Sequence, residues 1–352
     1  MTELAQIIAA RIAATGPITL ADYMADCLLH PQHGYYTTRM PFGAAGDFTT
    51  APEVSQMFGE LMGLALAQSW LDQGAPAPFT LGELGPGRGT LMADVLRATW
   101  AVPGFHAAAQ VVLVEASPAL RITQAKRLHP HPVRHEATLA SLPDQPLFLL
   151  ANEFFDALPI RQFQHDGNHW RERLVGLRDG HLVFGLSDPI PRAPDAPAFA
   201  APEPGRVVEL CPQAHPVAQD IGQRIRTQGG VALIVDYGGW RSAGDTFQAL
   251  RAHQFVDPLA EPGLADLTAH VDFEALAHSA ALPYGYAEQG AFLSRLGIDA
   301  RAAKLAQSLT GAALQSHLAA HRRLTHPAEM GSLFKVLGLY CPGSPPPPGF
   351  AA

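Results

Sequence analysis

Short apolar runs in the centre of the chain alternate with stretches of helical periodicity. Runs with the length and composition of strands buried on both faces lie at residues 79–84, 111–114, 147–151 and 231–235. Helical stretches begin near Thr90 and Ser117, directly after the first two runs. Because strands that alternate with helices form parallel sheets covered by helices, this pattern predicts an α/β fold with a mostly parallel sheet and helices on both faces.

The first 75 residues have a helical pattern instead. Leu4, Ile8 and Ile12 are spaced for one helical face, and residues 19–22 have the form of a capping box before a second helix. After a glycine-rich loop at 42–48, we expect one long helix from about Pro52 to Asp72. The side chains expected to face inward from it are Met57, Leu61, Leu64 and Ala65.

Residues 160–229 interrupt the alternation of strands and helices. Residues 161–164, 170–177 and 181–186 are typical of meander strands separated by Asp-Gly turns, and 187–206 is an extended Pro-rich loop. We therefore expect a helical N-terminal extension with an active-site loop at 1–75 and a core built from 76–159 and 230–341. An inserted β-meander subdomain at 160–229 and a flexible Pro-rich tail at 342–352 complete the expected organisation.

Composition narrows the class of protein. The chain has 352 residues, of which 47% are hydrophobic and 16% charged, and 24 basic against 32 acidic residues give a net charge of −8. This balance disfavours a disordered chain and general binding to nucleic acid. No apolar stretch approaches the roughly 18 residues of a membrane span, and the N-terminus has no secretory pattern. Isolated cysteines (Cys27, Cys211, Cys341) predict neither a disulfide framework nor a cysteine zinc site, so we expect a reduced intracellular protein.

A glycine motif lies where the first buried strand ends and a helix begins. It reads Glu83-Leu84-Gly85-Pro86-Gly87-Arg88-Gly89-Thr90. Glycines at such a turn let a ligand approach the backbone, and the helix start offers free N–H groups. The motif is not a dinucleotide fingerprint, because Thr90 stands in place of the third glycine, and it has no Gly-Lys-Ser/Thr of a P-loop.

Acidic residues follow several of the predicted strands. Glu83, Glu115, Glu153 and Asp156 are expected at one edge of the sheet, with Arg88 nearby. An acid after the second strand can accept hydrogen bonds from ribose hydroxyls. A pyrophosphate would be repelled there, whereas a ligand with an ammonium and a sulfonium, such as S-adenosylmethionine, would be attracted. The structural alternative is a set of solvated strand-end residues around a tight turn.

The segment after the third strand is a second candidate for chemistry. Glu153 and Asp156 could hold a guanidinium by paired hydrogen bonds. The alternative is a helix start, capped by Asn152 with Asp156 in the first turn. Both roles are compatible.

Beyond these motifs, most of the chain resembles the MidA family of S-adenosylmethionine-dependent methyltransferases, which includes the mitochondrial complex I assembly factor with protein-arginine methyltransferase activity. The segments that carry the resemblance are 30–36, 46–60, 83–91, 152–159, 236–238, 265–273 and 330–337. The resemblance implies a class I methyltransferase, Rossmann-like sheet, with S-adenosylmethionine as cofactor and S-adenosylhomocysteine as product. It also implies methylation of a protein arginine, with a respiratory complex I core subunit as the substrate class.

The resemblance assigns roles to residues of this chain. Asn152, Glu153 and Asp156 are the candidate catalytic residues, although no paired-glutamate loop like that of better-known arginine methyltransferases is present. Tyr35, Tyr36 and His270 are candidates for the substrate channel, and Asp47, Phe48, Thr49 and Thr50 for a loop that closes over the cofactor. As plain structure, the tyrosines would pack, the loop would be a turn with a cap, and His270 would cap a helix. The expected cofactor-binding residues are Glu83, Gly85, Pro86, Gly87, Gly89 and Thr90 with Glu115, His135, Glu136, Ala137 and Asn152.

Other functions remain as alternatives. One is a non-catalytic assembly factor that binds the cofactor and acts as a chaperone for complex I, and another is a nicotinamide-dependent oxidoreductase. His129, His131 and His135 lie close together, but no carboxylate or cysteine completes a usual ligand set, so we expect no metal site. The absence of Gly-x-Ser-x-Gly leaves a hydrolase unsupported. The Ala-, Pro- and Arg-rich composition suggests a bacterial cytoplasmic protein.

Overall fold

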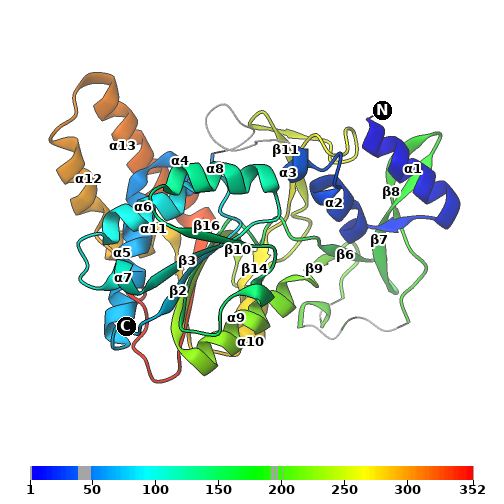
Figure 1. Cartoon of the computed structure of the whole chain (residues 1–352). Helices are drawn as coiled ribbons and strands as arrows, with labels where there is room; N and C mark the ends of the chain where they lie inside the picture. The colour runs from blue at the N-terminus through cyan, green and yellow to red at the C-terminus, as the bar shows by residue number, and fades with distance from the viewer. Residues whose placement is uncertain (1, 39–48, 192–193, 195–196, 201, 352) are drawn as a thin grey trace.

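The apolar runs predicted as strands lie side by side at the centre of the protein (Figure 1). The computed structural model describes residues 2–38, 49–191, 194, 197–200 and 202–351. The order of the strands in the central sheet is β15-β16-β10-β5-β2-β3-β4. The last five strands in this order run parallel to one another. The predicted α/β class with a mostly parallel sheet is therefore confirmed. The parallel strands are β2 (Phe79–Leu84), β3 (Ala109–Val114), β4 (Val133–Glu136), β5 (Leu147–Asn152) and β10 (Gly230–Gly239).

Two antiparallel strands complete one edge of the sheet. β16 (Phe334–Tyr340) pairs with β10, and β15 (Tyr284–Glu288) pairs with β16. The short β14 (Val271–Asp272) continues the pairing at the carboxyl end of β10. From β2 the chain builds the sheet outward to β3 and β4, and it then returns to place β5 on the other side of β2. Ligands of open α/β sheets bind at such a reversal, outside the carboxyl ends of the strands.

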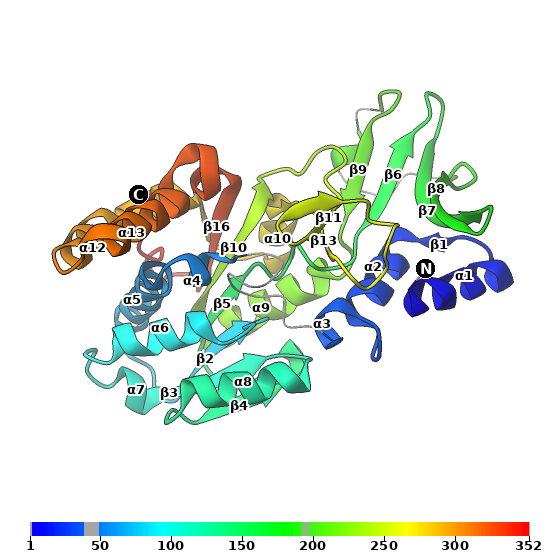
Figure 2. The ribbon, with the colours of Figure 1, turned by 90° about the horizontal axis from the view of Figure 1, so that it is seen from above.

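Helices cover both faces of the sheet (Figure 2). On one face α5 (Gln56–Asp72) and α6 (Thr90–Thr99) join a core with α11 (Gln289–Arg295), α12 (Ile298–Ala306) and α13 (Gly311–Thr325). On the other face α9 (Ala214–Gln228) and α10 (Phe273–Ala280) bury a second cluster against β5 and β10. Further helical elements are α7 (Phe105–Ala108), α8 (Pro118–Leu128), η1 (Leu139–Ser141), η2 (Pro197–Phe199) and η3 (Pro327–Gly331).

The single helix expected from Pro52 to Asp72 is wrong, because the chain breaks it at Ser55. α4 (Ala51–Val54) ends there, and the extended Ser55 caps α5 by accepting the Met57 N–H at 3.2 Å. The expectation that Leu64 faces inward is also wrong, since its side chain is 44% exposed. α6 packs instead against the side of α5 that carries Gly63, where an added Cβ would lie 2.9 Å from the Val95 Cα.

The N-terminal helices pack on the meander. Three N-terminal elements, α1 (Glu3–Thr15), β1 (Ile18–Thr19) and α2 (Leu20–Leu29), share a buried cluster with β7 (Trp170–Arg178). The Thr19 hydroxyl accepts the Asp22 N–H at 3.0 Å, as expected of an N-cap. Residues 160–229 contain the three predicted meander strands, a fourth strand, and α9 on the central sheet. These strands are β6 (Arg161–His165), β7 (Trp170–Arg178), β8 (His181–Leu186) and β9 (Val207–Leu210).

The Pro-rich C-terminal segment packs against the core, contrary to the expectation of a loose tail. The Phe350 ring lies 5.0 Å from that of Phe292. It also fills the space beside Gly285 and Gly338, where a Cβ would overlap the ring. Among the described residues, no helix has the length and apolar composition needed to cross a membrane.

Candidate functional site

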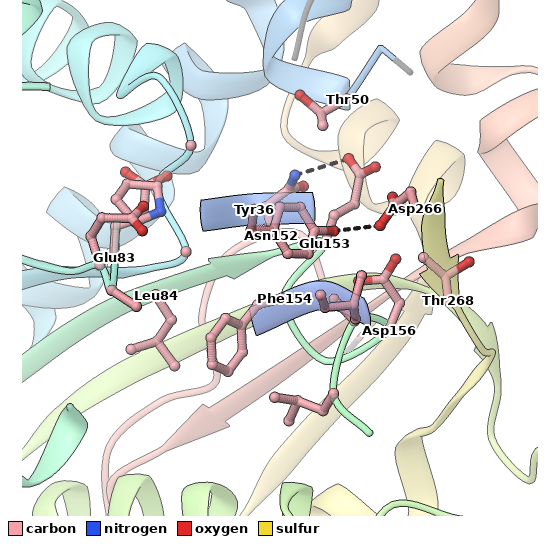
Figure 3. A pocket seen from close by; sticks show the side chains of 18 of the residues that line it. Tyr36, Thr50, Glu83, Leu84, Asn152, Glu153, Phe154, Asp156, Asp266 and Thr268 are labelled. Carbon is pink, nitrogen blue, oxygen red and sulfur yellow. Dashed lines mark hydrogen bonds between the residues drawn. The ribbon is translucent and has the colours of Figure 1, made fainter. Parts of the chain in front are cut away.

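A cavity of about 720 Å³ opens at the carboxyl ends of β2, β3 and β5. Its walls come from the glycine motif, the ends of these strands, α3 (Tyr35–Thr38) and a small sheet, one strand of which lies at the right in Figure 3. The small sheet has the order β12-β11-β13, with β11 (Gln248–Arg251), β12 (Gln254–Val256) and β13 (Asp266–Thr268). The cavity therefore lies where the reversal of the sheet predicts a ligand.

The glycine motif forms a tight loop between β2 and α6. Gly85, Gly87 and Gly89 have φ values of +59°, +50° and +76°, which residues other than glycine rarely adopt. At Gly85 an added Cβ would also lie 3.0 Å from the Phe154 ring. Gly89 is the N-cap residue of α6, so the N–H groups of the first helical turn are directed toward the loop. The loop can therefore hold a ligand against its backbone.

Glu53, which sequence reasoning missed, anchors this loop from α4. Its carboxylate accepts hydrogen bonds from Arg88 and, at 2.6 Å, from the Thr90 hydroxyl. Burial acts to raise the pKa of Glu53, but hydrogen bonds from Arg88 and Thr90 lower it below its ordinary value. Arg88 is thus neutralised by Glu53 rather than by the acids that follow the strands. The segment 46–60, which carries the family resemblance, contains this residue.

Glu115 occupies the end of β3 in a network organised by Gln124. One oxygen of Glu115 accepts the Ser117 N–H at 2.8 Å, and the other accepts from Gln124 Nε2 at 3.1 Å. Gln124 Nε2 also donates to the Gly87 carbonyl at 2.7 Å, and its Oε1 lies 2.9 Å from His135 Nε2. Burial raises the pKa of Glu115. Nothing in the sequence distinguished Gln124 from other helix residues.

The residues expected near an adenine divide into two groups. Ala137 lines the cavity together with the following Thr138 and Leu139. His135 is turned toward Gln124, and Glu136 forms an ion pair with Arg134, so neither side chain lines the cavity. The structure thus brings Ala137 to the site and leaves His135 and Glu136 beside it.

Glu83 presents a buried carboxyl at the end of β2. Its side chain is 3% exposed, and Oε2 has no hydrogen-bond partner among the described residues. Burial is the main reason that the pKa of Glu83 rises to about 8, and the nearby Glu115 adds to this rise. An acid in this state is stabilised by a cationic ligand.

Asn152, at the end of β5, and Glu153 and Asp156, directly after it, line the cavity together, as expected (Figure 3). Glu153 has a φ of +50°, an unusual conformation for a glutamate, and its Oε1 accepts the Ala51 N–H at 3.2 Å and Asn152 Nδ2 at 3.0 Å. Burial, reinforced by Asp156, raises the pKa of Glu153 to about 8, and burial raises that of Asp156 to about 6. Asn152 Oδ1 and Asp156 Oδ1 have no hydrogen-bond partner in the described part of the chain.

Asp236 and Tyr237, at the end of β10, position Asp156. The Asp236 carboxylate accepts the N–H groups of Phe155 and Asp156 at 3.1 and 3.2 Å. Tyr237 donates its hydroxyl to Asp156 Oδ2 at 2.6 Å. Sequence reasoning did not assign roles to these two residues, although segment 236–238 carries the family resemblance.

Only some of the residues expected around the substrate line the cavity. Tyr36 lines the cavity and donates its hydroxyl to Asp266 Oδ1 at 2.7 Å, whereas Tyr35 is buried in the N-terminal cluster. Thr50 and His270 line the cavity, and Thr49 does not. His270 does not cap α10, because Asp272 does. Asp47 and Phe48 lie outside the described residues.

The cavity thus combines a glycine loop with three buried acids, Glu83, Asp156 and Asp266, and with the half-buried Glu153. Within residues 2–38, 49–191, 194, 197–200 and 202–351, no group of His, Cys, Asp and Glu has the arrangement of a metal site.

Comparisons with known proteins place this geometry in context. The model of a family of S-adenosyl-L-methionine-dependent methyltransferases matches residues 61–291. A Drosophila melanogaster relative, named protein arginine methyltransferase NDUFAF7 homolog, mitochondrial, is 38% identical over 96% of this chain and 85% of its own. The human protein arginine methyltransferase NDUFAF7, mitochondrial, is 37% identical over 96% of this chain and 83% of its own. A Burkholderia thailandensis crystal structure with bound S-adenosyl-homocysteine has a TM-score of 0.83 and 30% identity, and the match covers 99% of this chain and 92% of that one.

Proposed function

The chain belongs to the family of S-adenosyl-L-methionine-dependent methyltransferases, with the class I fold expected from the sequence, and from this premise we propose that it methylates an arginine guanidinium of a protein. The main support is the pair of carboxyls of Glu153 and Asp156 at the cavity, for which no ion pair occurs in the described part of the chain. A guanidinium satisfies two carboxylates by paired hydrogen bonds. The names of the relatives, which specify protein arginine, agree with this chemistry.

The residues at the glycine loop fit a cofactor with positive charge at its methionine end. Glu83 Oε2 and Asn152 Oδ1 are buried acceptors without partners among the described residues. We propose that Gly85, Pro86, Gly87, Gly89 and Thr90 hold the methionine part with them. Glu115 retains lone pairs for the ribose hydroxyls, Ala137 lies beside the adenine, and His135 acts indirectly by orienting Gln124.

The remaining residues bind and orient the arginine. The bound cofactor supplies an electrophilic methyl group. Glu153 and Asp156 accept N–H groups of the guanidinium, and Tyr237 and Asp236 hold Asp156 in place for this contact. The nitrogen that becomes methylated loses one proton, which the carboxylate of Asp156 accepts; its pKa, which burial raises to about 6, suits this transfer near neutral pH.

We further propose a respiratory complex I core subunit as the substrate and the bacterial cytoplasm as the location. The substrate proposal rests on the family resemblance of the segments 46–60, 83–91 and 265–273, and the location on composition. The net charge of −8 is compatible with attraction of an arginine-bearing segment.

Calorimetric titration of the purified protein with S-adenosylmethionine and with NADH tests the cofactor site. We expect micromolar binding of the first and none of the second. Gly87→Val should abolish binding, and Glu115→Ala should weaken it at least tenfold because a ribose contact is lost. Gly180→Val, at another left-handed glycine outside the cavity, and Glu261→Ala, at an exposed acid, are the matched controls. Unchanged affinity in Glu115→Ala would refute the assigned ribose contact.

Methylation itself is tested with complex I core subunits and methyl-labelled cofactor, followed by amino-acid analysis. The expected product is methylarginine, and Asp156→Asn should abolish it while cofactor binding persists. Cofactor binding without turnover on any subunit would favour the non-catalytic assembly factor instead.

A further inference from the structure

One face of the small sheet forms a wall of the cavity. In its antiparallel register Leu250 lies directly opposite Phe255 on one side and Asp266 on the other, and Gln248 lies opposite Thr268. Directly opposed residues point to the same side of a sheet. All of these side chains accordingly line the cavity, and Figure 3 shows Asp266 and Thr268 side by side on β13.

The other face of the small sheet fixes it to the body of the protein. Ala249 and Leu267 alternate with the cavity-facing residues and are buried in the cluster formed by α1, α2 and β7. The wall is therefore a supported surface and not an unpacked hairpin. Its position is set by the same core that holds Tyr36 against Asp266.

The exposure of the side chains decreases along the row formed by Phe255, Leu250 and Asp266. Phe255 is 75% exposed, Leu250 is half-buried and Asp266 is 5% exposed. Most of the Phe255 side chain is therefore outside the core, and it lines the cavity. Leu29 and Leu333, which are also exposed, line the same cavity from other elements. An exposed apolar surface continuous with a polar site is typical of an interaction surface.

We propose that this face of the small sheet is the docking wall for the arginine-bearing segment of the substrate, and that Phe255 contacts an apolar residue beside the arginine. This inference rests on the proposed function, because the acids at the inner end of the row are complementary to a guanidinium. The occupant is a protein segment in which an arginine is flanked at short range by an aliphatic or aromatic side chain.

The register sets the distance between the two contacts. Two inter-strand spacings, about 10 Å in total, separate Phe255 from Asp266. An extended chain spans that distance in about three residues. An apolar residue within about three positions of the arginine can therefore reach Phe255 while the guanidinium lies among the acids.

Binding of short peptides to the full chain, saturated with S-adenosylhomocysteine, tests the wall. Both probes are five residues long, blocked at the ends, with a central arginine; one has leucine at both outer positions and glycine elsewhere, and the other has glycine throughout. We expect the leucine peptide to bind about fivefold to tenfold more tightly, from the apolar area that one leucine buries. Phe255→Thr should remove this preference, and in methylation assays it should raise KM for the leucine peptide without changing kcat.

Phe184→Thr is the matched control, because it makes the same change on a strand of another sheet, outside the cavity. Threonine suits a strand, and Phe255 is so exposed that its replacement leaves the core intact. Equal affinity of the two peptides, or a preference that survives in Phe255→Thr, would overturn the docking wall while leaving arginine methylation standing. If replacing the central arginine of the peptide by glutamine changes nothing, the proposed function fails and the wall with it.

Discussion

Replacing Glu83 by glutamine is expected to stabilise the free protein increasingly as pH rises from 5 to 8, and to weaken cofactor binding. Glu83 is buried at the end of β2, and no ion pair compensates its charge in the described part of the chain. Burial raises its pKa to about 8, so folding favours the protonated form. The glutamine side chain has a similar shape and never ionises, so a comparison of the two proteins isolates the charge.

The size of the effect on the free energy of unfolding follows from the pKa shift of Glu83. The unfolded chain loses the Glu83 proton near its ordinary pKa of 4.5 and the folded protein near 8. Between these values the unfolded state binds fewer protons, so the free energy of unfolding falls as pH rises, by up to about 1.4 kcal/mol per pH unit. From pH 5 to pH 8 this amounts to about 3.5 kcal/mol. For 352 residues it corresponds to about 5 °C in the midpoint of thermal unfolding.

Thermal unfolding followed by circular dichroism at pH 5, 6, 7 and 8 measures the effect. The midpoint of the parent protein should fall relative to that of Glu83→Gln by about 5 °C over this range. Glu203→Gln, at an exposed acid outside the cavity for which no ion pair occurs among the described residues, should follow the parent. S-adenosylmethionine should raise the midpoint of the parent much more than that of Glu83→Gln, because the ionised carboxylate attracts the positive end of the cofactor.

Parallel midpoints of the parent and Glu83→Gln across the whole pH range would refute this reasoning. That result would mean that Glu83 is ionised in the folded protein at pH 5. A partner or solvent contact would then have to stabilise its charge. Equal stabilisation of both proteins by the cofactor would separately refute the contact between Glu83 and the cofactor.

Three further changes test the site and the fold. Glu53→Gln should weaken cofactor binding in calorimetry by about tenfold, because the glycine loop loses its charged anchor to Arg88. Tyr237→Phe removes a hydrogen bond that lowers the pKa of Asp156, so the acidic limb of the pH–rate profile should move to higher pH. Phe350→Ala should lower the free energy of unfolding, measured in urea, by about 2 kcal/mol while cofactor affinity stays unchanged.

Local patterns of the sequence predicted the elements that carry the site. Strands buried on both faces appear as continuous apolar runs, and the glycine loop appears because left-handed backbone requires glycine at Gly85, Gly87 and Gly89. Both features depend on neighbouring residues only. The sheet order then brings the strand-end acids to one cavity.

Contacts between distant segments could not be predicted in the same way. Glu53 binds Arg88 and Gln124 binds Gly87, although the members of each pair are far apart in the sequence. The periodicity of apolar residues contains no information about such contacts. The position of a residue in the sequence also does not determine where its side chain points, as His135 shows. It lies near the end of β4, as Glu83 lies near the end of β2, but its ring is turned toward Gln124.

Buried acids of this protein fall into two kinds, and the difference argues for a ligand. Glu60, on α5, receives hydrogen bonds from two arginines, and Glu172, on β7, pairs with one arginine. Glu83 and Asp156 are buried as well, and Glu153 is half-buried, yet no ion pair to these three acids occurs among the described residues. A carboxyl needed only for the fold could be replaced by an apolar or amide side chain of similar size with a gain in stability. The acids that raise the cost of folding near neutral pH and line the cavity are explained by cations that bind there and offset this cost.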